Sequence, residues 1–183
     1  DSPNLESLSK GTNKEILKIW EGLGYYSRAI NMLKTAKTLA ENKKKFPSSY
    51  ESLIKLKGVG DYTASAISSI CKNEKRAVLD GNVFRVISRV FNISAPINTI
   101  TGKRIFQKLT FKLLPDNQIG DYNQGLMDFG SLHCTIRNPK CKSCPLKNLC
   151  KSYKLNNIKN RPRKIKRTAP KKKRIYNYLR III

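Results

Sequence analysis

The chain has 183 residues, of which 39% are hydrophobic, and this is enough to bury the core of one large domain or two small ones. Its 37 Lys and Arg residues against 12 Asp and Glu residues give a net charge of +25, which indicates a polyanionic partner. A compositional bias toward Lys, Asn and Ile is the alternative source of this charge. There is no apolar run near the length of a membrane span and no signal peptide at Asp1, so the sequence excludes a membrane protein and predicts a soluble, intracellular one.

Apolar residues recur at helical spacing over most of the chain, and the sequence therefore predicts an all-α protein. In chain order, we expect helices over residues 16–20, 29–40, 48–54, 63–70, 83–90, 105–114 and 124–132. Ser48 and Glu51 have the spacing of a capping box, which predicts that the third helix opens at Ser48. Cys71 follows the apolar face of the fourth helix, where we expect a buried and unreactive thiol.

A basic segment follows the last of these helices. Residues 159–174 contain two prolines and almost no apolar residue, which is typical of a linker or tail, and we expect this segment to be disordered in isolation. Residues 175–183 are aromatic and β-branched, and they predict a strand. Because a single strand is not stable by itself, we expect this strand to be the start of a further domain.

The first candidate binding motif is LKGVGDYTASAI, residues 56–67, where two glycines lie on either side of a valine between two expected helices. Glycines let the backbone turn sharply and approach a ligand closely, and the next helix begins with unpaired N–H groups. This geometry suits a phosphate, although a G-x-G turn between helices is often only a tight connection. The candidate phosphate-binding residues are Lys57, Gly58, Val59, Gly60 and Thr63.

The second candidate motif is AVLDGNVFRV, residues 77–86, in which Asp80 is followed by Gly81, Asn82 and a helix. An Asp before a helix is most often only its N-cap. A carboxylate beside a base-binding pocket can instead stabilise a positive charge that develops on a sugar. The residues alone leave both roles open.

The third candidate motif is C-x6-C-x2-C-x5-C, formed by four of the five cysteines. Disulfides rarely persist in the reducing compartment that we expect for this chain. Four thiolates satisfy either a tetrahedral zinc site or a 4Fe-4S cluster, and the spacing does not separate the two. His133 is expected to be a packing or surface residue, because four thiolates already complete the site. The candidate metal ligands are Cys134, Cys141, Cys144 and Cys150.

In this order, the three motifs resemble the helix-hairpin-helix DNA glycosylase superfamily, and the resemblance covers essentially residues 1–153. It implies a partial six-helix barrel beside an iron-sulfur cluster domain, with Asp80 at the cleft between them and a 4Fe-4S cluster on the four cysteines. We therefore expect four segments. They are a helical barrel with the hairpin over residues 1–74, the catalytic-Asp and cluster domain over 75–153, a basic linker over 154–174, and the first strand of a Nudix-like domain over 175–183.

Three features indicate the branch of this superfamily. WEGLGYYSRA, residues 20–29, and LDGNV, residues 79–83, resemble the adenine DNA glycosylases of the MutY type rather than endonuclease III. Tyr62 stands where the endonuclease III relatives have the Lys that forms a Schiff base, so lyase chemistry lacks its nucleophile. The resemblance implies a monofunctional enzyme that removes adenine mispaired with guanine or 8-oxoguanine from double-stranded DNA. It also implies a monomer in the cytoplasm, associated with the nucleoid in a bacterium.

The resemblance also implies roles for individual residues. Asp80 would stabilise the oxocarbenium ion, and Asn82 and Tyr62 would orient neighbouring groups. The hairpin would anchor a phosphate through its backbone N–H groups. Further phosphate contacts are expected from basic residues near the cysteines, for which a solvated surface charge is the alternative. These residues are Arg137, Lys140, Lys142 and Lys147.

The chain departs from the family pattern at two points. Lys57 stands where the hairpin usually has Pro, and the family's Glu that protonates adenine has no counterpart here. We therefore expect this chain to bind mispaired DNA but to excise adenine very slowly or not at all. The alternatives are a DNA-binding module that has lost the acid and, disfavoured by Tyr62, an endonuclease III-like glycosylase-lyase. We also expect that deletion of the residues after Lys154 improves solubility and leaves the cluster intact.

Overall fold

The computed structural model describes residues 4–166, which form helices and no strand. The helices are α1 Leu5–Ser9, α2 Asn13–Ile19, α3 Tyr26–Glu41, α4 Tyr50–Leu53, α5 Asp61–Lys72, α6 Gly81–Val90, α7 Ile100–Lys112, α8 Ile119–Leu132, α9 Lys151–Lys154 and the 3-10 helix η1 Ile158–Asn160. The all-α prediction is confirmed, and the seven expected helices correspond to α2–α8. The sequence did not predict α1, α9 and η1, because helices of three to five residues are too short to show a helical period. No helix in the described part is long and apolar enough to cross a membrane.

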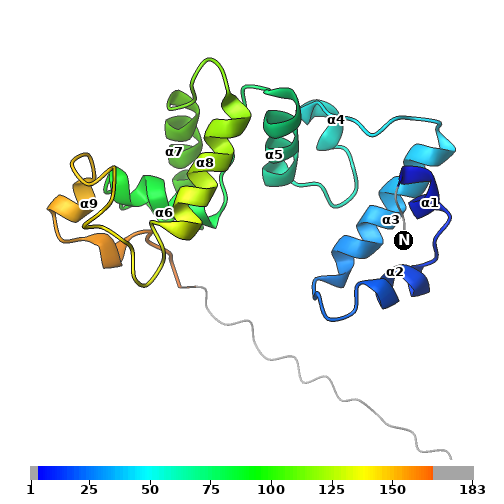
Figure 1. Ribbon diagram of the computed structural model, residues 1–183, viewed down its shortest axis with the longest axis horizontal. Coiled ribbons are helices and arrows are strands. Elements are labelled where there is room, and N and C mark those ends of the chain that lie inside the picture. Colours follow the sequence, from blue (N-terminus) through cyan, green and yellow to red (C-terminus); the bar gives the residue numbers. More distant parts are fainter. Residues whose placement is uncertain (1–3, 167–183) are drawn as a thin grey trace, which may run out of the picture.

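The helices form two groups that are joined through α4 and α5 (Figure 1). In the N-terminal group, α1 and α2 both pack against α3. In the second group, α8 packs against both α5 and α6, while α7 and α9 contact α6. The helix α6 is therefore central to the second group, and its packing determines where the Asp80 motif at its N-terminal end lies.

The apolar core of the second group surrounds α6. Val83 and Ile87 of this helix pack with Ile97 and Phe106, and all four side chains are buried. Phe84 meets Phe106 edge to face, with 5.1 Å between the ring centroids. Burial of these side chains holds the N-terminal end of α6, where the second candidate motif lies.

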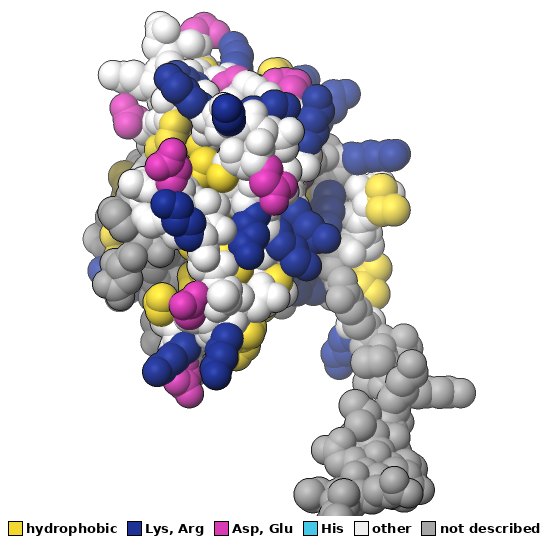
Figure 2. Space-filling model, turned by 90° about the vertical axis from the view of Figure 1, so that its right-hand side faces the viewer, with side chains coloured by type: hydrophobic (Ala, Val, Ile, Leu, Met, Phe, Trp, Pro, Cys, Tyr) yellow, Lys and Arg dark blue, Asp and Glu magenta, His cyan; other side chains and the backbone are white. Residues whose placement is uncertain are grey.

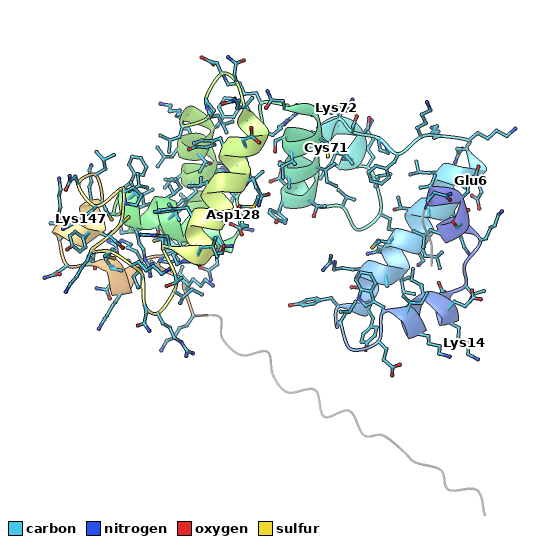
Figure 3. All side chains as sticks on the ribbon, viewed as in Figure 1. Glu6, Lys14, Cys71, Lys72, Asp128 and Lys147 are labelled. Atoms are coloured by element: carbon cyan, nitrogen blue, oxygen red, sulfur yellow. The ribbon has the colours of Figure 1, made fainter. Side chains whose placement is uncertain are left out.

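Small residues let α5 and α8 approach closely. A Cβ atom on Gly120 of α8 would lie only 2.8 Å from the carbonyl oxygen of Ser69. The larger apolar residues at the end of α5 point outward instead: Ile70 is 47% exposed, and Cys71 is also exposed (Figure 3). The prediction of a buried Cys71 is therefore wrong, because the buried face of α5 is built from small side chains that apolar periodicity does not count. That face consists of Ala64, Ser65, Ser68 and Ser69.

The start of α4 differs from the capping box predicted at Ser48. The N-cap is Ser49, whose side chain caps no backbone N–H group. Its hydroxyl donates to the Ser52 hydroxyl at 3.0 Å, and Glu51 pairs with Arg76. The capping box prediction is wrong, because Glu51 finds a charged partner outside its own helix.

Residues 158–166, which we call the strap, lie against the loop between α6 and α7. The side-chain amide of Asn98 donates to the Ile165 carbonyl at 2.8 Å and accepts from the Ile165 N–H group at 2.9 Å. The N–H group of Ile97 donates to the Arg163 carbonyl at 3.0 Å. In a free tail, the backbone N–H and C=O groups of the strap would bond to water, whereas here several of them bond to the protein.

The strap changes the interpretation of the basic segment. A guanidinium nitrogen of buried Arg89 donates to the Arg161 carbonyl at 3.2 Å, which adds a further anchor. The expected disorder is therefore wrong for residues 159–166, because their backbone groups bind a loop that composition does not reveal. The rest of the expected linker and the expected strand, residues 167–183, lie outside the described residues.

Candidate functional site

Asp80 is the N-cap of α6, and both oxygens of its carboxylate accept hydrogen bonds. Oδ1 accepts from the backbone N–H group of Val83 at 2.7 Å, and Oδ2 accepts from the side-chain amide of Asn82 at 2.8 Å. The carboxylate is half-buried and is held in one orientation by these two bonds. The N-cap role is therefore present, and it also fixes a negative charge at the end of the helix.

The amide of Asn82 is held in turn by Arg85. The Arg85 guanidinium donates to Asn82 Oδ1 at 2.8 Å, to the Cys134 carbonyl at 2.7 Å and to the Gly130 carbonyl. Because the amide oxygen is occupied by this donor, the amide nitrogen faces Asp80. Arg85 is only 6% exposed, and it connects the Asp80 carboxylate to the start of the cysteine loop. Sequence reasoning missed Arg85, although an arginine in the middle of an apolar helix was an available signal.

The turn between α4 and α5 contains the two glycines of the first motif. Gly58 has a φ of +83°, and a Cβ atom there would lie 2.6 Å from the Cβ atom of Asn31, so the turn requires glycine. Gly60 is the N-cap of α5 and provides no side-chain cap. No described group accepts a hydrogen bond from the backbone N–H groups of residues 60–63. This turn, which we call the hairpin, thus presents free donors at the start of a 12-residue helix.

The other hairpin residues are placed around these donors. Lys57 is exposed, and its carbonyl accepts from the Thr35 hydroxyl at 3.3 Å, which ties the hairpin to α3. The N–H group of Val59 donates to the Leu56 carbonyl at 3.1 Å. Thr63 is half-buried in the first turn of α5. The predicted phosphate-binding residues therefore do lie together.

Tyr62 lies on the surface of the first turn of α5. It is 47% exposed and lines a groove of about 970 Å³ between the hairpin and α1 and α3. Asp80 and Asn82 do not line this groove. The structure therefore brings Asp80 and Asn82 into contact, and Tyr62 lines a groove that neither of them lines.

Basic side chains lie on several surfaces of the molecule. Figure 2 shows the face formed by α1–α3, where Lys and Arg side chains lie among Asp and Glu side chains. In the cysteine loop, residues 133–150, the side chains of Arg137, Lys140 and Lys142 are exposed. Lys147 lies at the opposite end of the molecule from α1–α3, with its ammonium 5.8 Å from the ring centroid of Tyr153 (Figure 3). Three of the four predicted basic residues are thus free to meet a polyanion.

The four predicted cysteine ligands line one cavity, beside the C-terminal end of α6. The cavity is otherwise lined mainly by apolar and basic side chains. His133 also lines it: its ring stacks on Phe129 with 5.2 Å between the centroids, and its buried Nε2 atom has no partner among the described residues. The packing role predicted for His133 agrees with this stacking. The ligands are Cys134, Cys141, Cys144 and the buried Cys150.

The thiols lie close enough together to affect one another's protonation. Burial raises the pKa of the Cys141 and Cys144 thiols, and neighbouring cysteines raise both further. A guanidinium nitrogen of Arg89 lies 3.4 Å from Cys134 Sγ, where it can stabilise negative sulfur. Among residues 4–166, no group of three or more His, Cys, Asp or Glu side chains is spaced to hold a single metal ion. Four cysteines on one cavity provide the number and type of ligands that a 4Fe-4S cluster takes.

Known proteins with similar sequences include adenine DNA glycosylases. The chain is 43% identical over 169 residues to an adenine DNA glycosylase of Buchnera aphidicola subsp. Schizaphis graminum (strain Sg), covering 90% of the chain and 48% of that protein. It is 37% identical over 153 residues to an adenine DNA glycosylase of Homo sapiens, covering 82% of the chain and 28% of that protein. The chain thus spans about half the length, or less, of these relatives.

Solved structures share the fold. A thermostable thymine-DNA glycosylase has a TM-score of 0.73 and 31% identity, covering 82% of this chain and 70% of that chain. Endonuclease III in a non-covalent DNA complex has a TM-score of 0.72 at 24% identity, covering 84% and 71%, and this likeness concerns the fold alone. A family model described as "HhH-GPD superfamily base excision DNA repair protein" matches residues 1–111, which is more than half of the chain. The chain therefore belongs to the HhH-GPD superfamily of base excision DNA repair proteins.

Proposed function

We propose that the chain is the core of a monofunctional adenine DNA glycosylase, which hydrolyses the N-glycosidic bond of adenine opposite guanine or 8-oxoguanine. The observation that carries this proposal is the Asp80 carboxylate, held at the start of α6 by the Asn82 amide and the Val83 N–H group. The similarity to adenine DNA glycosylases supports the choice of base.

Asp80 acts on the sugar. The target base must leave the stack before its bond can be attacked. As the bond to adenine breaks, positive charge develops on the sugar, and a carboxylate fixed nearby stabilises that charge without having to reorganise. Asn82 and Arg85 keep the carboxylate in place during this step. Protonation of adenine is assigned by the resemblance to a Glu that has no counterpart in the chain.

Tyr62 makes the enzyme monofunctional. A phenol cannot form the Schiff base through which a lysine amine cleaves the strand at an abasic site. We therefore expect the product to be an intact abasic site. Because Tyr62 is half exposed on the groove, its role is to face the DNA near the lesion.

Double-stranded DNA binds as a polyanion to several sites on one monomer. The free N–H groups of residues 60–63 take a backbone phosphate, with Lys57 and Thr63 beside them. Arg137, Lys140 and Lys142 add phosphate contacts from the cysteine loop, and the net charge of +25 supports binding that depends little on sequence.

Cys134, Cys141, Cys144 and Cys150 would hold a 4Fe-4S cluster in the cysteine cavity. A bound cluster would tie these four residues of the cysteine loop together and so would stiffen the loop. Arg85 donates to the Cys134 carbonyl, so a rigid loop also supports the residue that orients Asn82.

The test is a single-turnover assay on a duplex with one adenine opposite 8-oxoguanine, followed by alkali to reveal abasic sites. It uses the 183-residue chain and the same chain extended at its N-terminus by a helix that carries the Glu. We expect slow excision by the first, faster excision by the second, and a loss of roughly a hundredfold or more when Asp80→Asn is introduced into the second. Asp116→Asn, which removes an exposed carboxylate of the α7–α8 loop, serves as the control.

Three outcomes would contradict the proposal. Strand cleavage without alkali would indicate a lyase. If the Asp80→Asn variant excised adenine as fast as the protein with Asp80, the carboxylate would have no role in the reaction. Tight binding of mispaired DNA with no excision by either form would favour the DNA-binding module.

A further inference from the structure

The hairpin carries its own anion beside the free N–H groups. Asp61 is the first residue of α5, it directly follows Gly60, and its side chain is exposed. A carboxylate at this position can accept hydrogen bonds from the same N–H groups that a phosphate would use, and it repels a phosphate that approaches. Asp61 would therefore compete with DNA unless something held it aside.

Tyr50 of α4 holds the Asp61 side chain. The Tyr50 hydroxyl donates to Asp61 Oδ1 at 2.7 Å, and no N–H group of residues 60–63 donates to this carboxylate. The bond to Asp61 is the main cause that raises the pKa of Tyr50. The phenol therefore stays protonated around neutral pH and remains a donor.

The position of Tyr50 is itself fixed from two sides. Its backbone N–H group donates to Glu74 Oε2 at 3.0 Å, and the Arg76 guanidinium lies 3.9 Å from the centroid of its ring. Arg76 in turn pairs with Glu74 at 2.9 Å and with Glu51. These contacts join α4 to the segment after α5, so the Tyr50 hydroxyl has a fixed position relative to the hairpin.

We propose that Tyr50 is a positioning residue of the phosphate site: it draws the Asp61 carboxylate toward α4 and so leaves the N–H groups of residues 60–63 free for a DNA phosphate. This inference rests on the proposed DNA-binding function. Asp61 limits the affinity of the hairpin in the native protein, and it limits the affinity further when Tyr50 cannot hold it.

The proposal predicts opposite effects for two conservative changes. Asp61→Asn removes the competing charge, and we expect DNA affinity to rise about two- to fivefold at low salt. Tyr50→Phe removes only the hydroxyl and releases the carboxylate, so we expect affinity to fall by a similar factor. In the double variant no carboxylate remains to be held, so its affinity should equal that of Asp61→Asn alone.

The experiment measures Kd by fluorescence anisotropy with a labelled duplex that contains a stable abasic-site analogue. It compares the 183-residue chain with Asp61→Asn, Tyr50→Phe and the double variant at two salt concentrations. Asp116→Asn is the matched control, since it removes one negative charge from a 91% exposed site that pairs with Lys75. Thermal melting checks that each variant is folded. We expect the differences to shrink at high salt.

The double variant separates a positioning role from a merely structural one. If Tyr50→Phe weakens binding equally with Asp61 and with Asn at position 61, Tyr50 only stabilises α4 and the inference is overturned. An unchanged Kd for Tyr50→Phe, or an equal gain for Asp61→Asn and Asp116→Asn, would also overturn it. If the native chain itself does not bind the duplex, the proposed function fails instead, which is a different result.

Discussion

The side chain of Asn98 binds the backbone of Ile165 as a neighbouring strand would, with one hydrogen bond given at 2.8 Å and one accepted at 2.9 Å. This pair makes the strap part of the folded domain. The strap also carries Ile158, which lines the cysteine cavity. The strap therefore closes one side of the proposed cluster site.

We predict that deletion of residues 158–183 lowers the melting temperature and exposes the cysteine cavity, whereas deletion of residues 167–183 alone does neither. This replaces the expectation that everything after Lys154 can be removed. Asn98→Ala in the full chain should cost on the order of 1 kcal/mol, because two modest hydrogen bonds are removed. Equal melting of the two truncated chains would contradict the prediction.

A pair of glycines on α8 tests how the start of α6 is held. A Cβ atom on Gly130 would lie 2.7 Å from the Cβ atom of Asn82, whereas a Cβ atom on Gly125 would meet nothing within 4 Å. We predict that Gly130→Ala displaces Asn82, costs roughly 1–3 kcal/mol of stability and lowers the excision rate. Gly125→Ala should stabilise the same helix by up to about 1 kcal/mol and leave the rate unchanged. Chemical denaturation and single-turnover kinetics provide the two measurements.

Arg85 should influence catalysis without touching the substrate. We predict that Arg85→Met reduces the single-turnover rate and leaves DNA affinity nearly unchanged, because the Asn82 amide loses the donor that orients it. The variant should also be less stable by roughly 1–3 kcal/mol, since the carbonyls of Gly130 and Cys134 lose a buried partner. Arg104→Met, on the exposed side of α7, is the control. A variant that lost affinity and rate in parallel would point to direct binding of DNA by Arg85.

The metal is identified by analysis of the anaerobically purified protein. We predict four iron atoms per chain, a broad visible absorbance and no zinc. Cys144→Ser should lower the iron content and the melting temperature together, because cluster binding is linked to folding. Cys71→Ser should change neither, since that thiol is exposed and lies outside the cavity. One zinc atom per chain without iron would exclude the cluster.

Salt dependence measures the contribution of the cysteine loop to DNA binding. We predict that replacing Arg137, Lys140 and Lys142 by Gln reduces the slope of log affinity against log salt by about 0.9 for each phosphate that is no longer neutralised. The control is Lys14→Gln on α2, at the other end of the molecule (Figure 3). If the slope is the same for both proteins, these three charges are solvated and do not meet DNA.

Much of the fold could be predicted from the sequence, because α3 and α5–α8, each of 10 to 16 residues, are long enough to show periodicity. The buried serines of α5 and the exposed Cys71 could not be predicted. The close packing of α5 against Gly120 requires small side chains, whether or not they are apolar. The strap was missed for a related reason. Its backbone is held by Asn98, 67 residues earlier in the chain, and composition carries no information about such a partner.

The candidate site divides in the same way. Asp80, Asn82 and the hairpin glycines belong to local motifs and were found from neighbouring residues. Arg85 was not, although it stands in an apolar helix, because two of its acceptors are carbonyls 45 and 49 residues later in the chain. The bond between Tyr50 and Asp61 was also missed, since it joins two elements across a turn.

The partners of Arg89 bear on how the protein is synthesised. Arg89 is 2% exposed, and its guanidinium donates to the carbonyls of Thr135, Ile136 and Arg161, which follow it by 46, 47 and 72 residues. During translation, α6 can form early, but this buried cation has no protein acceptors until those carbonyls have left the ribosome. The end of α6 that carries Arg89 is therefore completed late, and a nascent chain paused before residue 161 still lacks the last of the carbonyls that surround this guanidinium in the finished protein.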